Sequence, residues 1–260
     1  MLLAAIQNHV SATPPFDILT GQGFGLLLGL LAIMSIVPFV MTLTTSFAKF
    51  VIVLGLVRQA LGTQQTPPNM IVTGIALILT IHVMWPVGEQ AYANYVQAQA
   101  SREPSSEQAA GGSTVSTEEL MRVLEAAQDP IHGYLARNSS PKFVKTFEKL
   151  AHAKQKGDAP PQRTLRGDLA AKHPRVARVV DDLIVYAPAF LLTELTEAFE
   201  IGFMVFIPFL VIDLVVGNVL LAMGMQMLSP QTIALPLKLL LFVAIGGWQL
   251  IVTGLVTGYA

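Results

Sequence analysis

Four long apolar blocks and one polar segment alternate along the chain. The apolar blocks run from about Phe24 to Val57, from Met70 to Val87, from Leu183 to Met223 and from Ile233 to Val256. A helix needs about 20 apolar residues to cross a bilayer, and the first and third blocks are longer than that. The pattern predicts an all-α membrane protein.

Prolines interrupt the two longest blocks. Pro38 lies in the first block, and Pro188 and Pro208 lie in the third. Proline removes a backbone donor and its ring clashes with the preceding turn of a helix. We therefore expect each of these blocks to form a broken or extended helix rather than one straight span.

Short segments rich in turn residues, "RQALGTQQTPPN" and "MGMQMLSPQT", separate the blocks of each pair. The pattern thus predicts two long kinked apolar helical hairpins flanking a small polar helical insertion. The expected parts are an N-terminal segment, a first hairpin, the insertion and a second hairpin with a methionine-rich turn. Their limits are 1–23, 24–88, 89–182 and 183–260.

The insertion carries most of the charge, with 13 of the 16 Lys and Arg residues and 12 of the 17 Asp and Glu residues. Two helices are predicted in it. One follows Ser116, a plausible N-cap, and the other covers "SPKFVKTFEKLAHAKQK", where Phe143, Phe147 and Leu150 share one face. Charge counting does not place the insertion on one side of a membrane, because that rule holds for loops shorter than about 60 residues.

The composition agrees with a membrane protein and excludes several kinds of chemistry. Only 13% of the residues are charged, against about 25% in soluble domains. A net charge of −1 leaves no electrostatic footprint for nucleic acid. The absence of cysteine excludes thiolate metal sites, and no P-loop, HExxH or GxSxG motif is present. We expect no enzyme activity, cofactor or metal, and, because the first residues lack Lys and Arg, no cleavable signal peptide.

A few charged residues interrupt the apolar blocks, and they require partners. A charge at the bilayer centre costs about 2.5–3.5 kcal/mol, so three unpaired carboxylates on one helix would cost on the order of 8–10 kcal/mol. Glu194, Glu197 and Glu200 recur every third residue and are expected along one side of a helix that does not face lipid. Such residues form either an ion or proton pathway or buried pairs between helices or subunits, and we favour the pairs. The residues concerned are Lys49, Arg58, Glu194, Glu197, Glu200, Asp213 and Lys238.

Several long segments, in this order, resemble the FliP/SctR family of core export-gate proteins from flagellar and virulence-associated type III secretion systems. They are "TSFAKFVIVLGLVRQALGTQQTPPN", "PAFLLTELTEAFEIGF", "IPFLVIDLVV", "MGMQMLSP" and "LPLKLLLFV". The resemblance covers about Ile36–Val87 and Val185–Tyr259. The long insertion and the expected lack of a signal peptide favour the injectisome member SctR, whereas "RQALGTQQTPPN" is closer to flagellar FliP. Two positions depart from the family pattern: Gly246 stands where the family often has Asp, and Gln226 interrupts a run of methionines.

The resemblance implies an assembly in the bacterial inner membrane, much of it on the periplasmic side together with the insertion. Five copies would join SctS/FliQ-like and SctT/FliR-like subunits into a helical pore complex for unfolded secreted proteins. SctU/FlhB-like and SctV/FlhA-like export proteins would be further partners.

The resemblance also implies that the methionine-rich turn is a pore gasket. Its residues are Met223, Met225, Gln226 and Met227. Methionine is apolar and flexible, so a ring of such side chains can seal a pore and repack around a passing chain. Met225 and Met227 are expected to point to the pore axis and Gln226 partly away. From the residues alone, gap filling at the end of a helix is the simpler explanation.

A small-solute or ion transporter is the competing function. It would also use buried charges and broken helices, but it predicts internal hydropathy symmetry and a polar site at the membrane midplane. Neither is evident in the sequence.

Overall fold

The computed structural model describes residues 31, 34–36, 38–63, 67–100, 117–153, 174–225 and 227–259. The chain forms two units, Met1–Thr42 and Leu43–Ala260. The described residues of the first unit are helical, and the predicted N-terminal segment 1–23 lies outside the described residues. The features that follow belong to the second unit, except for the helical segment Pro38–Thr44, which crosses the boundary.

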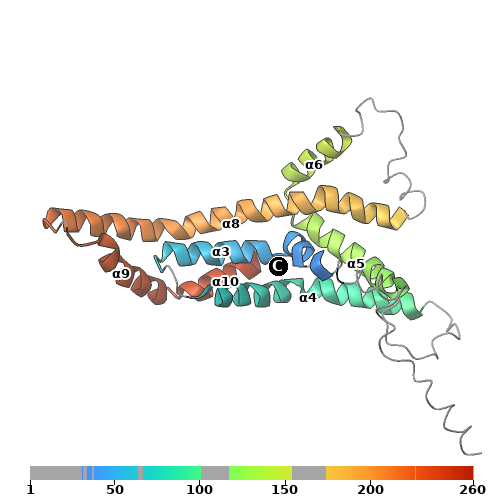
Figure 1. Ribbon diagram of the computed structural model, residues 1–260, viewed down its shortest axis with the longest axis horizontal. Coiled ribbons are helices and arrows are strands. Elements are labelled where there is room, and N and C mark those ends of the chain that lie inside the picture. The colour runs from blue at the N-terminus through green and yellow to red at the C-terminus, as the bar shows by residue number, and fades with distance from the viewer. Residues whose placement is uncertain are drawn as a thin grey trace, which may run out of the picture. The chain divides into compact units, whose positions relative to one another are not determined.

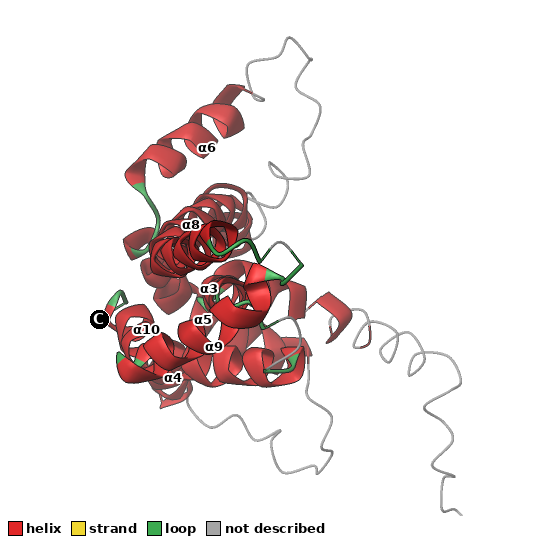
Figure 2. Cartoon of the chain, turned by 90° about the vertical axis from the view of Figure 1, so that its left-hand side faces the viewer, coloured by secondary structure: helices red, strands yellow, loops and turns green. Residues whose placement is uncertain are grey.

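The second unit is built from helices, and the described residues contain no strand (Figures 1 and 2). The prediction of an all-α protein is confirmed. The helices are α3 (Phe47–Ala60), α4 (Asn69–Ala100), α5 (Thr117–Arg137), α6 (Pro141–Ala153), α8 (Pro174–Ala222), α9 (Pro230–Ala244) and α10 (Gly247–Thr257).

Helix α8 is a continuous helix of 49 residues with Pro188 and Pro208 inside it. At 1.5 Å per residue its length is about 74 Å. The hydrocarbon core of a bilayer is only about 30 Å thick. The third apolar block is therefore an extended helix, and an upright α8 reaches well beyond the hydrocarbon.

Two described helical segments, Asn69–Ala100 and Ile184–Ala222, are long and apolar enough to cross a membrane. The number rises to four if each of two interrupted helix pairs counts as one span. One pair joins Pro38–Thr44 to α3 through a turn, and the other joins α9 to α10. The membrane character predicted from hydropathy therefore agrees with the helix lengths.

The boundaries of the polar insertion fall within helices. Helix α4 continues past residue 88 to Ala100, and α8 begins at Pro174, before residue 183. These boundaries mark a change of polarity along continuous helices. The two helices predicted inside the insertion are confirmed as α5 and α6, whereas Ser116 lies outside the described residues.

Helix α3 lies at the centre of the second unit and packs on α8 and α4. It runs parallel to α8 (Figure 1). Near its start Lys49 meets Glu197, and farther along Leu56 packs on Gly202. A Cβ atom at position 202 would lie 2.2 Å from the Leu56 side chain, so glycine permits this close approach. Four fully buried α3 side chains anchor the core: Phe50, Val53, Leu54 and Val57.

The fourth apolar block bends by 59° between α9 and α10. Gly246 in this turn has a φ of 65°, in the left-handed region that L residues rarely adopt. Asp and Asn are among the few other residues that tolerate this region. Glycine and the Asp that the family resemblance leads one to expect therefore suit the same backbone geometry.

Candidate functional site

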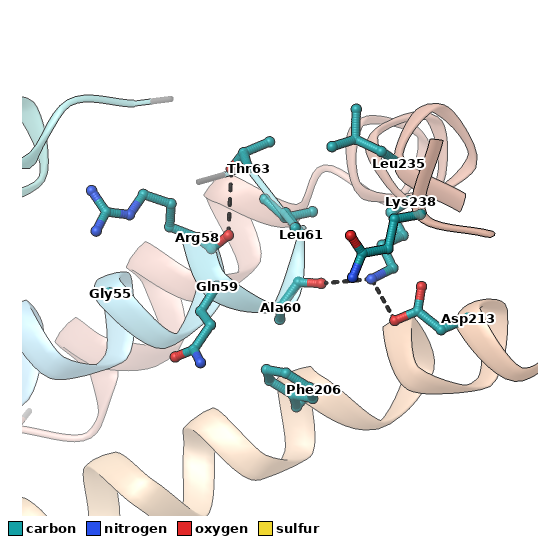
Figure 3. A pocket seen from close by; sticks show the side chains of 12 residues that line it. Gly55, Arg58, Gln59, Ala60, Leu61, Thr63, Phe206, Asp213, Leu235 and Lys238 are labelled. Atoms are coloured by element: carbon teal, nitrogen blue, oxygen red, sulfur yellow. Dashed lines mark hydrogen bonds and ion pairs between the residues drawn. The ribbon is translucent and has the colours of Figure 1, made fainter. Parts of the chain in front are cut away.

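A buried lysine joins three helices near the end of α3 (Figure 3). Lys238 of α9 is 7% exposed. Its Nζ donates to Asp213 Oδ2 of α8 at 2.7 Å and to the carbonyl of Ala60 at 3.2 Å. Ala60 is the last residue of α3. The ammonium thus lies where the partial negative charge of a helix C-terminus favours a cation.

The carbonyls at the end of α3 are fully satisfied. Those of Val57, Arg58, Gln59 and Ala60 each accept a hydrogen bond. Gly62, with a φ of 75°, supplies the left-handed residue that commonly closes a helix. Lys238 therefore acts as a side-chain cap contributed by a distant helix.

A pocket of about 500 Å³ lies beside this cap. Arg58 lines it and donates to the Pro67 carbonyl at 3.3 Å and to Asn69 Oδ1, which ties the segment before α4 to α3. Figure 3 shows the Arg58 guanidinium directed away from Lys238. The pocket is lined by Gly55, Arg58, Gln59, Ala60, Leu61, Gly62, Thr63, Phe206, Asp213, Gln231, Leu235 and Lys238.

A second polar cluster lies at the start of α3. Lys49 Nζ is 2.5 Å from Glu197 Oε2 and lies 4.5 Å from the centre of the Tyr259 ring. The hydroxyl of Tyr259 donates to the carboxylate of Glu194, which is 1% exposed. The cluster joins α3, α8 and the C-terminal turn.

Tyr259 is a site residue that the sequence reasoning missed. Its ring packs edge-on against Phe50 at 5.8 Å and stacks on Tyr134 of α5 at 6.3 Å. Burial, and then the negative charge of Glu194, raise the pKa of Tyr134 above its ordinary value. An aromatic residue near the end of the chain carries no pattern that reveals such contacts.

The three glutamates of α8 lie on one side of the helix but have different surroundings. Glu194 is buried, the Glu197 side chain is 47% exposed, and Glu200 is exposed. Three residues turn an α-helix by about 300°, so each step falls roughly 60° short of a full turn. Within the described part of the chain Glu200 makes no ion pair.

The predicted charged residues therefore divide into separate groups. Lys49 pairs with Glu197, and Lys238 pairs with Asp213. Glu194 is joined to Tyr259 and not to Lys238.

The methionine-rich turn follows the end of α8. Gly224 has a φ of 73°, and the amides of Gly224 and Met225 donate to the carbonyls of Leu221 and Leu220. This pair of hydrogen bonds is the Schellman motif, which ends many helices at a left-handed glycine. Met223, Met225 and Met227 are 60%, 42% and 101% exposed. Gln226, for which an outward orientation was predicted, lies outside the described residues.

Among the described residues, no group of three or more His, Cys, Asp or Glu side chains is arranged to hold a metal ion. The polar chemistry of the site consists of ion pairs and hydrogen bonds between helices.

Comparisons with known proteins agree with the family resemblance. The model described as the FliP family matches residues 30–255. The hypersensitivity response secretion protein HrcR of Ralstonia nicotianae is 40% identical over 244 residues, covering 91% of this chain and 97% of that protein. The Yop proteins translocation protein R of Yersinia pestis is 39% identical over 233 residues, covering 88% and 93%.

A flagellar relative matches to a similar degree. The flagellar biosynthetic protein FliP of Caulobacter vibrioides is 39% identical over 245 residues, covering 92% of this chain and 80% of that protein. The family match extends through α3, α8, the methionine-rich turn and α9, which hold every residue of the two polar clusters except Tyr259. The chain belongs to the FliP family.

Proposed function

We propose that the chain is a core subunit of a type III secretion export gate, an oligomeric pore through which unfolded proteins leave the cell. The relatives' names, which include secretion, translocation and flagellar biosynthesis proteins, support a role in protein export. The observation that most directly supports a pore is the exposed turn of three methionines at the end of α8. Exposed apolar side chains at the end of a long helix would be covered where copies converge.

In this proposal the copies assemble around one axis, with five as the expected number. Long helices with exposed apolar side chains support an assembly, because the outer face of α8 is apolar from Phe199 to Leu221. Glu200 lies at one end of this face. A subunit neighbour can accommodate that carboxylate better than lipid can.

The methionines would act as a gasket. A hydrophobic constriction excludes ions by dewetting, and unbranched methionine side chains can move aside for a polypeptide. Helix α8 ends at Ala222, and the left-handed Gly224 directs the chain out of the helix within the turn.

The expected partners are the SctS/FliQ-like and SctT/FliR-like subunits, with SctU/FlhB-like and SctV/FlhA-like export proteins. We place the assembly in the inner membrane with the insertion on the periplasmic side. The length of α8, about 74 Å, is consistent with an assembly that stands beyond the hydrocarbon. The injectisome branch is favoured over the flagellar one by the long insertion.

Ion conductance tests the gasket. Deleting Met225–Met227 should make membranes that contain the assembled complex leak small ions, while native mass spectrometry still finds the oligomer. Deleting Thr114–Ser116 of the insertion, a change of the same length, is the control. An assembled complex that carries the methionine deletion and conducts no more than its parent would refute the gasket, and monomers alone would refute the oligomer.

A further inference from the structure

Three charged residues in the apolar halves lack an ion pair within the described part of the chain, and one of them, the buried Glu194, accepts a hydrogen bond from Tyr259 instead. Lys49 and Lys238 have carboxylate partners. Arg58 of α3 contacts only neutral oxygens, those of Pro67 and Asn69. Glu200 of α8 has no basic partner among the described residues. Because Glu194 is only 1% exposed, Arg58 and Glu200 are the two that an incoming partner can reach.

The surroundings of Glu200 make an unpaired carboxylate costly. Phe199, Phe203 and Met204 beside it and one turn farther along are 59%, 69% and 72% exposed, so the carboxylate lies at the border of an apolar surface, with polar Thr196 and Glu197 one turn earlier. If lipid or apolar protein covered this surface, the buried carboxylate would be costly unless the covering surface also supplied a cation.

The surroundings of Arg58 leave room for an incoming side chain. Arg58 lines the pocket of about 500 Å³ together with Gly55, which lies one turn earlier on the same face of α3. A Cβ atom at Gly55 would find no atom within 4 Å. The pocket beside the guanidinium therefore has space on the side of Gly55.

Within one chain, Arg58 and Glu200 lie at different positions along the parallel axes of α3 and α8. Leu56 packs on Gly202 where α3 and α8 run parallel. Arg58 lies two residues beyond that contact and Glu200 two residues before it. Four residues at 1.5 Å each separate the two positions along the helices by about 6 Å.

We propose that Arg58 of one copy forms an ion pair with Glu200 of the next copy. The inference rests on the proposed oligomer and names the contact that joins its subunits. Because the two partners belong to different surface patches, the interface is heterologous and generates a ring or a helix. A shift of about 6 Å between copies brings the two positions level, which makes the assembly a shallow helix rather than a flat ring.

The chain has no cysteine, so engineered cysteines report the contact without background. Arg58→Cys and Glu200→Cys are placed in two differently tagged chains that are expressed together. Only a bond between copies can then link the two tags. The control replaces Glu200→Cys by Met204→Cys, one turn farther along α8, at the position level with Arg58 if the copies were not shifted.

The long side chains of an Arg–Glu pair hold their Cα atoms farther apart than the roughly 7 Å that a disulfide allows, so a short bifunctional thiol reagent supplies the link. The expected result is a cross-linked dimer with Glu200→Cys, formed about ten-fold more efficiently than with Met204→Cys. Equal or greater linkage at Met204→Cys would overturn the shifted contact. No linkage at either position, in complexes that native mass spectrometry shows to be assembled, would overturn the inference and leave the proposed function standing. An unmodified chain that never assembles would instead refute the proposed function.

Charge exchange provides a measurement that does not depend on cysteines. Arg58→Glu and Glu200→Arg should each reduce the assembled fraction by about ten-fold, because like charges then face each other across the interface. The double variant should assemble as the parent does. A double variant that assembles no better than the single variants, while each isolated chain unfolds at the parent temperature, would overturn the pairing.

Discussion

The bridge between Lys238, Asp213 and Ala60 supports a quantitative prediction. Lys238→Met keeps the length and apolar stem of the side chain but removes the ammonium. Asp213 then loses its partner at 2.7 Å, and the Ala60 carbonyl at the end of α3 loses its side-chain donor. We expect α3, α8 and α9 to be held together less firmly.

The magnitude follows from the burial of the two partners. Breaking a buried ion pair costs about 3–5 kcal/mol, whereas an exposed pair contributes about 1 kcal/mol or less. The Lys238 side chain is 9% exposed and that of Asp213 is 44% exposed, so water can partly solvate the remaining carboxylate. We therefore expect a loss of about 2–3 kcal/mol in the free energy of unfolding, between these two limits.

Thermal unfolding in detergent, followed by far-ultraviolet circular dichroism, measures this loss. For a chain of this size the shift corresponds to roughly 4–12 °C in the midpoint. Lys142→Met on α6 is the matched control, because Lys142 is exposed and makes no ion pair within the described residues. It should leave the midpoint within about 1–2 °C of the parent.

A double variant separates a true pair from two unrelated residues. Asp213→Leu alone should be at least as damaging as Lys238→Met, because it leaves a buried ammonium without a carboxylate. Combining the two should recover most of the loss, since apolar replacement of both members of a buried pair is often neutral. Losses that add in the double variant would refute the coupling on which this reasoning rests.

Two further substitutions test local features. Tyr259→Phe should destabilise the fold by about 1–3 kcal/mol, because the buried Glu194 loses a hydrogen-bond donor; thermal unfolding checks this, with exposed Tyr92→Phe as the control, and equal midpoints for the two variants would contradict it. Gly246→Val should cost about 1–2 kcal/mol through its left-handed backbone, and Gly246→Asp should cost less. Because a Cβ at this position meets no atom within 4 Å, equal midpoints for Val and Asp would show that the backbone is not the cause.

The order of apolar blocks was sufficient to predict the helical membrane class and the two helices of the insertion. Helix formation in such segments depends on local hydropathy and periodicity, which a sequence displays directly. Prolines were a weaker guide. Pro188 and Pro208 lie inside a continuous α8, which packs on α3, α5, α6 and α9.

The sequence also indicated which charged residues need partners, since charges in apolar blocks are costly wherever they lie. It did not indicate which partner each would have. Lys238 reaches the end of α3 across a separation of 178 residues, and Tyr259 reaches Glu194 across 65. Such pairs depend on which helices lie side by side and on how far each helix is shifted along its axis relative to its neighbour.

The three glutamates illustrate the same division. Their spacing determined that they follow one another around α8 in steps of about 60°. Only the packing of α3, α5 and the C-terminal turn decided that Glu194 is buried while Glu200 faces outward. A sequence determines where each side chain points on its own helix, but the neighbouring helices decide whether that direction leads to a partner, a pocket or the surface.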